Sequence, residues 1–355
     1  MQLLDSNFRL EKTSIFFYYV LIVGFMSLWL SPFMVSVSTG LSLIYVAINV
    51  KHLFGVKNIR IIYVSFAIFS LSLIDILFNG FTSTTSSKFL LLLGFVVALA
   101  SFSILLNQKK NSLVNLTLIL SSVVSLVNIL AITNYFLNKE FYDALLLQSK
   151  SIPIPNMHHI HFGIINACVI AVLIGILLTK KLKGKIQFNF AIGLLIISFI
   201  SFHTLSSRTG LLSFYVGLLV SLVWYTIQKK SFKALIIGFI VIILSLSLSY
   251  SFSDSFKNKI QNSVEDYNSW GKGDEINHKS MAMRMEASKM CIQIIRNYPL
   301  GVGAQAQKQV IQETYVKENT PLDVENRVGS HNQFLEFGVK YGWIGIILLM
   351  LFFVC

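Results

Sequence analysis

Long apolar runs separated by short polar stretches recur along almost the whole chain. We identify ten of them, most being long enough to cross a hydrocarbon layer of about 30 Å as a helix. They lie at roughly 14–32, 34–50, 59–78, 88–106, 113–132, 159–179, 187–203, 210–227, 233–252 and 334–355. Because a lone strand cannot satisfy its backbone in lipid, each run must be helical. The first two runs are the least distinct, since only Ser31-Pro32 divides them.

Basic residues are concentrated in every second polar stretch. One set of linkers holds 14 Lys and Arg residues against two acidic residues, whereas the alternate short linkers hold only Lys88, Lys139, Lys150 and Arg208. Basic residues gather on the cytoplasmic side of membrane proteins, so this bias predicts a cytoplasmic N-terminus. Residues 1–252 then form a bundle of about nine spans. The long segment 253–333, with ten basic and ten acidic residues, lies outside.

The composition supports a chain embedded in membrane lipid. Hydrophobic residues make up 54% of it and charged residues only 13%, about half the charged share of a soluble domain. The net charge of +13 would suit a nucleic-acid partner, but its position in the linkers assigns it to membrane topology, so we exclude nucleic acid. We therefore predict an all-α polytopic membrane protein with about ten transmembrane helices and one large extracytoplasmic loop containing short helices.

The last apolar run and the large loop complete this organisation. Residues 334–355 are predicted as the last transmembrane helix, which is still apolar at Cys355, so either it barely spans or the natural chain continues. In the loop, the spacing of apolar residues predicts a helix over Ser280–Asn297, ending before Pro299 and lying along the membrane surface. The residues expected near one face of this helix are Met281, Met285, Ile292 and Ile295.

Three polar residues at the outer face are candidates for chemistry. Arg208 lies between two spans with almost no loop around it, so it is either an interfacial arginine or a fixed guanidinium that binds phosphate oxygens. Arg284, on the loop helix, is either solvated or a second group of the same kind. His331 opens the last run and either caps that helix or takes a proton from a hydroxyl near neutral pH.

Further histidines lie at the same predicted face. His158 and His161 share one side of the helix that opens the sixth run, where a metal is conceivable. No cysteine or carboxylate is placed to complete such a site, so we favour a polar lining of a substrate cleft and no metal. His203 and Asn332 are weaker candidates for substrate binding.

Other patterns carry less weight. Asp75 lies near the outer end of the third run and is either functional or simply reaches the interface. Gly301–Ala306 matches a dinucleotide fingerprint, but no strand precedes it, so we set the match aside. Three scattered cysteines give neither a disulfide framework nor a metal spacing.

Three stretches together resemble the O-antigen ligase and O-antigen polymerase superfamily of bacterial integral-membrane glycosyltransferases. The first is Leu205–Leu212 (LSSRTGLL) at the entry to a span. The second is the large loop, in which Arg284 lies on a helix that leads into Asn297–Gly303 (NYPLGVG). The third is Ser330–Glu336 (SHNQFLE), followed by Tyr341–Gly345 (YGWIG). Their order and spacing carry the likeness, which covers about 187–355.

The resemblance implies transfer of a glycan from undecaprenyl diphosphate to an acceptor hydroxyl on the periplasmic side of the bacterial inner membrane. It implies inversion at the anomeric carbon, with no metal, cofactor or nucleotide sugar. By matching position, Arg208 and Arg284 would hold the diphosphate and His331 would activate or orient the acceptor. Relatives usually continue through one or two further spans.

Three functions stay open from the sequence. A ligase would join the glycan to a lipid A–core acceptor, which is the leading hypothesis. A polymerase of O-antigen or exopolysaccharide would use a second lipid-linked glycan as acceptor. A non-catalytic polysaccharide or lipid transporter ranks third, because it would require charged residues along a central path, whereas the charges here concentrate at one face.

Overall fold

We analysed a computed structural model of the 355-residue chain. It describes residues 2–54, 59–108, 113–147, 152–179, 182, 184–205, 208–230, 232–252, 254–272, 275–329 and 331–355. Ser206, Ser207 and Ser330 of the motifs above lie outside the described residues, and so does the side chain of Arg208.

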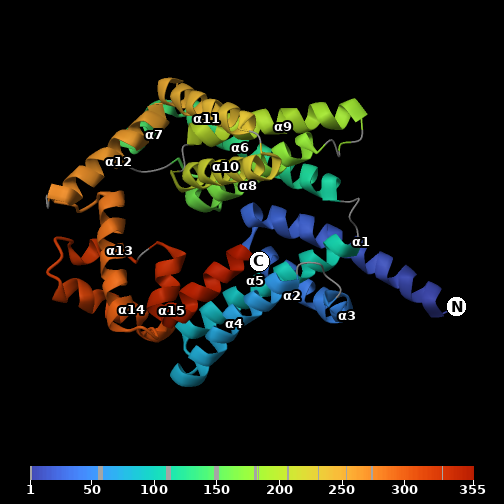
Figure 1. Ribbon diagram of the computed structural model, residues 1–355, viewed down its shortest axis with the longest axis horizontal. Coiled ribbons are helices and arrows are strands. Elements are labelled where there is room, and N and C mark those ends of the chain that lie inside the picture. Colours follow the sequence, from blue (N-terminus) through green and yellow to red (C-terminus); the bar gives the residue numbers. More distant parts are fainter. Residues whose placement is uncertain are drawn as a thin grey trace. The chain divides into compact units, whose positions relative to one another are not determined.

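The described residues fold almost entirely into helices, as the sequence predicted (Figure 1). The N-terminal half contains α1 Gln2–Leu30, α2 Pro32–Ile48, α3 Val50–Leu53, α4 Ile59–Asn79, α5 Ser83–Gln108, α6 Leu113–Leu137, α7 Lys139–Leu147 and α8 His159–Leu178. It is followed by α9 Gly184–Leu205, α10 Arg208–Lys229, α11 Lys233–Phe252, α12 Asp254–Lys272, α13 Ser280–Asn297, α14 Gly303–Lys317, a 3₁₀ turn Val324–Asn326 and α15 Gln333–Val354.

Eight helices in the described part of the chain are long and apolar enough to cross a membrane: α4, α5, α6, α8, α9, α10, α11 and α15. They coincide with eight of the ten predicted spans, which confirms the all-α, multi-pass membrane fold. The first two predicted runs lie in α1 and α2, whose apolar parts, Ser14–Leu30 and Pro32–Ile48, are shorter.

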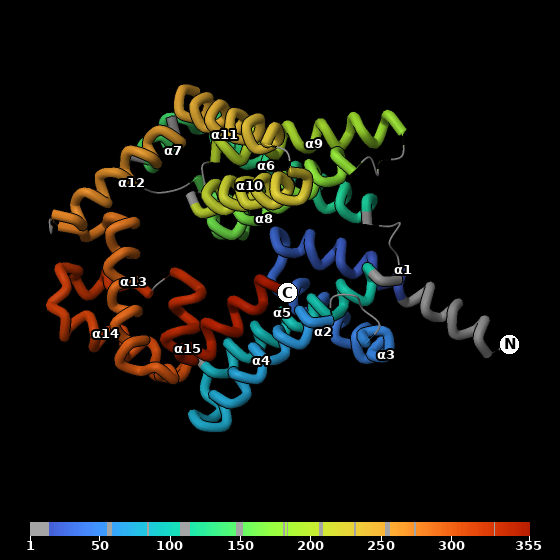
Figure 2. Tube along the Cα trace, viewed as in Figure 1, coloured from blue at the N-terminus to red at the C-terminus, as the bar shows by residue number. Residues whose placement is uncertain are grey.

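The chain forms two compact units. The first unit comprises residues 1–20, 37–109 and 263–355, and the second comprises 21–36 and 110–262. In the first unit, α4 pairs with α5 after a left-handed turn at Gly80, and α15 packs against α4 (Figure 2). Helices α13 and α14 pack against α15, so much of the predicted outer loop is part of this unit's core.

The second unit is built around α8, which contacts α6, α9 and α10, while α11 packs against α10. Its helices are joined by buried amides as well as by apolar side chains. Asn128 on α6 and Asn166 on α8 exchange hydrogen bonds of 3.1 and 3.2 Å, and both side chains are at most 1% exposed. Within a membrane such paired polar groups hold helices together, since neither can reach water.

The loop helix α13 has the predicted bounds but a different buried face. Its buried residues are Ala282, Glu286, Ala287, Met290, Cys291, Ile294 and Ile295. Ile292, expected on the apolar face, is 43% exposed. The buried face differs from the predicted one for two reasons. Glu286 is buried because it has polar partners, and the small Ala282 and Ala287 allow close packing. Helix α13 packs against α14 and α15 within the first unit, and its position along the membrane surface stays a prediction.

Candidate functional site

Arg284 lies on α13, a helix fixed by the buried carboxylate of Glu286. Trp270 donates its indole N–H to Glu286 Oε2 at 3.0 Å, and Lys289 lies 3.6 Å from Oε1. The N-terminus of α13 is held as well, because Asp266 Oδ2 accepts from the amide of Met281 at 2.9 Å. Among the described residues no hydrogen bond or ion pair reaches the half-buried guanidinium of Arg284. The helix is rigidly placed while this cation remains available to a ligand.

The segment after α13 packs directly against a break in α15. Gly342 has φ 62° inside α15, so the helix is interrupted there. The amide of Trp343 donates to Pro299 O at 3.0 Å and the amide of Val302 donates to Val339 O at 2.9 Å. The stretches Asn297–Gly303 and Tyr341–Gly345, remote in sequence, thus contact each other.

Two glycines make this contact possible. A Cβ at Gly342 would lie 1.9 Å from Pro299 O, and one at Gly301 would lie 2.3 Å from Lys340 O. Both glycines also have positive φ, which other residues adopt only with strain. The glycines of the two motifs are therefore required by backbone packing.

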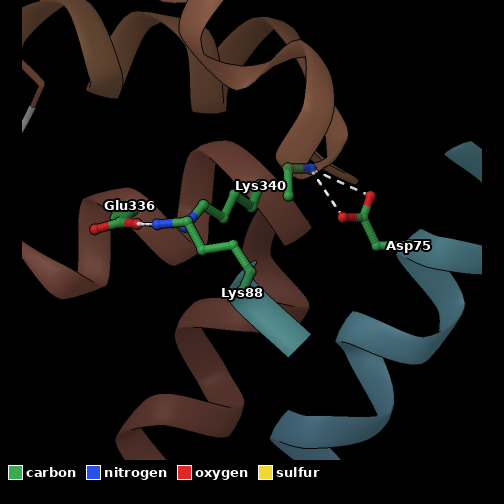
Figure 3. Close-up of polar contacts among 5 residues, drawn as sticks. Asp75, Lys88, Glu336 and Lys340 are labelled. Carbon is green, nitrogen blue, oxygen red and sulfur yellow. Dashed lines mark hydrogen bonds and ion pairs between the residues drawn. The ribbon is translucent and has the colours of Figure 1, made fainter. Parts of the chain in front are cut away.

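Asp75 contacts the start of α14, directly after the Asn297–Gly303 segment. Its two carboxylate oxygens each lie 3.2 Å from the amide of Ala304, in the first turn of α14 (Figure 3). One of these oxygens also accepts from Asn79 at 2.7 Å. Asp75 is 7% exposed. A carboxylate at a helix N-terminus satisfies free amides and opposes the positive end of the helix dipole. Asp75 thus caps the N-terminus of α14, and the Gly301–Ala306 segment contains the helix start that it caps.

His331 is placed by the cap of α15. Asn332 Oδ1 accepts from the amides of Phe334 at 2.9 Å and Leu335 at 3.3 Å. The preceding His331 has φ 48°, a left-handed backbone, and its side chain is exposed. The oxygen of Asn332 is used for helix capping, so the structure favours a positioning role for this residue over the predicted substrate contact.

In the second unit, four of the predicted residues gather at one end. His158 caps α8 by accepting from the amide of Ile160, and its ring centroid lies 5.9 Å from that of His161. A Cβ at Gly210 would lie 2.7 Å from the backbone of Gly163, so the first turns of α8 and α10 are in close contact. These turns carry His161 and Arg208, and α9 ends at the same place, just beyond His203.

His203 is bound on both sides of its ring. Its Nδ1 lies 2.8 Å from Phe199 O, its Nε2 lies 2.6 Å from the hydroxyl of Tyr215, and that hydroxyl lies 2.8 Å from Ser245 Oγ. A carbonyl accepts only, so Nδ1 carries the proton and Nε2 accepts from Tyr215. This partly buried chain of contacts links α9, α10 and α11. It gives His203 a packing role and leaves neither ring nitrogen for a substrate.

Below the contact of Gly163 with Gly210, the same two helices border an apolar groove of about 490 Å³. It is lined by α8 from Ile164 to Leu178 and by α10 from Ser213 to Tyr225. The groove runs along most of both spans. It offers space for an extended hydrocarbon chain.

Sequence reasoning missed one charged cluster. Lys340 lies within α15 with a side chain only 4% exposed, and its ammonium pairs with Glu336 one turn earlier. Lys88 on α5 contacts the same carboxylate oxygen (Figure 3). The signal that was available is a lysine seven residues into an apolar run, since an ionisable residue inside a span is usually functional.

In the part of the chain that the structure describes, no three His, Cys, Asp or Glu side chains lie close enough together to hold a metal ion. Arg208 belongs to the second unit, whereas Arg284, His331 and Asn332 belong to the first.

Comparison with known proteins gives one match. Residues 192–350 match the family model described as O-antigen ligase. The matched segment begins within α9 and ends within α15, so it contains Arg208, Arg284 and His331. No curated protein and no solved structure matches the chain.

Proposed function

We propose that this chain, whose residues 192–350 match the O-antigen ligase family model, moves a glycan from undecaprenyl diphosphate to a hydroxyl of a lipid A–core acceptor. The family match supports a glycosyltransferase of the ligase or polymerase type, and the apolar helices make the chain a multi-pass membrane protein. The observation that carries the proposal is the position of the match, which contains all three candidate residues of the reaction.

The proposed roles follow from the chemistry of each side chain. Arg208 and Arg284 bind the diphosphate, because a guanidinium forms paired hydrogen bonds with phosphate oxygens. Negative charge grows on the diphosphate as its bond to the sugar breaks, so each prearranged cation can lower the barrier by about 3 kcal/mol. The lack of an intramolecular partner for the Arg284 guanidinium among the described residues supports this role.

His331 acts on the acceptor. Its imidazole takes the proton of the acceptor hydroxyl while that oxygen attacks the anomeric carbon, and undecaprenyl diphosphate leaves from the opposite face. One displacement of this kind inverts the anomeric centre. Proton transfer by a positioned side chain contributes about 10²–10⁴-fold. The exposed position of His331 at the start of α15 supports access to an acceptor.

The proposed location is the bacterial inner membrane, with the site facing the periplasm. The lysine-rich linkers favour this orientation. The apolar groove between α8 and α10 suits the polyprenyl tail of the donor, since it lies directly below the turn that carries Arg208.

Reconstitution of the purified chain with a lipid-linked glycan tests the proposal. With a lipid A–core acceptor present, we expect glycan attached to lipid A–core, and added EDTA should leave the rate unchanged because the mechanism needs no metal. Absence of any transferred glycan from correctly inserted protein would contradict the proposal.

A polymerase is the second candidate, because the same family match and the same donor chemistry fit it. The acceptor distinguishes the two. Cells that lack a ligase should accumulate long glycan that is not attached to lipid A–core, whereas cells that lack a polymerase should carry single repeats.

A further inference from the structure

Two lysines of the first unit contact one carboxylate, that of Glu336, in the first turn of α15. Lys340 on α15 and Lys88 on α5 both contact Oε1 of Glu336, with Lys88 Nζ at 3.3 Å (Figure 3). Two cations against one anion leave the cluster with one positive charge in excess. Glu336 and Lys340 are the sequence neighbours of Phe337 and Tyr341, which pack with Ile68 of α4 in an apolar cluster.

The burial of the three side chains shows which lysine is the surplus one. The exposed fractions are 4% for Lys340, 28% for Glu336 and 40% for Lys88. A buried ammonium inside a span needs a counterion at all times, so Glu336 is committed to Lys340. Lys88 is the most accessible of the three, and its contact with an already neutralised carboxylate is the weakest interaction in the cluster.

The position of Lys88 suits a ligand at the membrane interface. It lies near the N-terminus of α5, and Glu336 lies near the N-terminus of α15, only five residues after His331. Asp75, at the C-terminal end of α4, contacts the start of α14. The first turns of α5 and α15 and the last turn of α4 thus lie at one end of the first unit, the end that bears His331.

We propose that Lys88 is a further anion-binding residue. Its ammonium gives up its contact with Glu336 and binds a phosphate group of a lipid phosphate. Glu336 holds the lysine in place when no ligand is bound, and Lys340 is a positioning residue that fixes Glu336. The choice of a polyprenyl diphosphate as the lipid rests on the proposed function. Phosphate is the stronger partner, because its several charged oxygens can take the ammonium that Glu336 only shares.

Direct binding of undecaprenyl diphosphate to the purified full chain in phosphatidylcholine nanodiscs tests this inference. Lys88→Gln should weaken binding at least about tenfold, the effect of one charged hydrogen bond, and Lys88→Arg should retain most of the affinity. Lys317→Gln, a lysine on the exposed side of α14, is the matched control and should bind as the unaltered chain does.

A second variant distinguishes lipid binding by Lys88 from a purely structural ion pair, because the two predict opposite changes in affinity for undecaprenyl diphosphate. Glu336→Gln combined with Lys340→Met removes both charges of the more buried pair, so position 340 carries no unpaired buried charge, and Lys88 loses its contact with a carboxylate. The inference predicts binding as tight as that of the unaltered chain or tighter. Weaker binding by this double variant, or unchanged binding by Lys88→Gln, would overturn it.

Two further comparisons identify the ligand and keep the inference distinct from the proposed function. Inorganic pyrophosphate alone should bind far more weakly than the lipid, and equal binding would overturn the lipid assignment. If the unaltered chain transfers glycan but binds the lipid without dependence on Lys88, only this inference fails. If Lys88-dependent binding is present without any glycan transfer, the inference stands and the proposed function fails.

Discussion

Single charged residues in the first unit hold the backbone segments on which the candidate residues lie. Asp75 binds the start of α14, Asp266 binds the start of α13, and Glu286 fixes α13 through Trp270. Each is at most 7% exposed. A buried carboxylate is stable only when donors surround it, so we assign these three acids a structural role. Asp266 and Glu286 hold α13, the helix that carries the proposed phosphate-binding residue Arg284.

Replacement of Asp75 by Ala should loosen α14. The amide of Ala304 would lose its acceptor in a buried place, so we expect a loss of about 1–2 kcal/mol in stability. Asp75→Asn keeps one acceptor oxygen and should lose less. Hydrogen exchange at the first amides of α14 measures the effect directly. Unchanged exchange in Asp75→Ala would show that the cap does not stabilise the helix.

The sequence predicted several candidate residues but not their structural partners. One predicted alternative was that His331 caps the last helix, but the N-cap is Asn332, one residue later. His203, Asp75 and Glu286 each have a partner on another helix, which no local spacing indicates. These partners are Tyr215, Ala304 and Trp270, respectively. The burial of Lys340 was not predicted, because an apolar run does not show which of its sides packs against other helices. In the structure α15 packs against α4 and α13, and Lys340 is buried.

Close helix contacts depend on glycines whose neighbours are backbone atoms. The contact between α8 and α10 occurs at Gly163 and Gly210, and the contact between the 297–303 segment and α15 occurs at Gly301 and Gly342. Helix existence and bounds were predicted well, as for α13, because a 3.6-residue period is a local property. The interruption of α15 at Gly342 was not predicted, since its cause is a carbonyl from a distant loop.

Gly210→Ala should force α8 and α10 apart, because its Cβ would lie 2.7 Å from the backbone of Gly163. Overpacking of this kind costs about 1–3 kcal/mol. Gly217→Ala is the matched control on the same helix, since nothing lies within 4 Å of its added Cβ. Thermal unfolding in detergent should therefore show a lower midpoint for Gly210→Ala alone. Equal midpoints for the two variants would contradict the packing assigned to this contact.

The predicted orientation of the whole molecule depends on how its charges are distributed between the two sides of the membrane. Its net charge of +13 comes mostly from linkers on one predicted side, while the folded segment 253–333 is neutral. The apolar runs predicted the multi-pass fold, and this division of charge predicts its orientation, because lysine is costly to move across a membrane. The packing of that segment into the first unit was not predictable, since composition does not indicate which helices it contacts.

Membrane orientation can be measured with single cysteines in a chain whose own cysteines are removed. We expect a membrane-impermeant maleimide to label Lys317→Cys on α14 in spheroplasts, because that residue lies in the predicted periplasmic segment. Lys229→Cys, at the end of α10, should react only after the membrane is opened. The reverse pattern would place the candidate residues in the cytoplasm.

The most direct test measures donor binding and glycan transfer in the same preparations of Arg208→Ala, Arg284→Ala and His331→Ala. The arginine variants should bind undecaprenyl-diphosphate-linked glycan at least about tenfold more weakly, because each loses a charged contact to phosphate. His331→Ala should bind the donor normally yet transfer about 10²–10⁴-fold more slowly. Transfer at the unaltered rate by all three variants, with normal membrane insertion, would contradict the proposed chemistry.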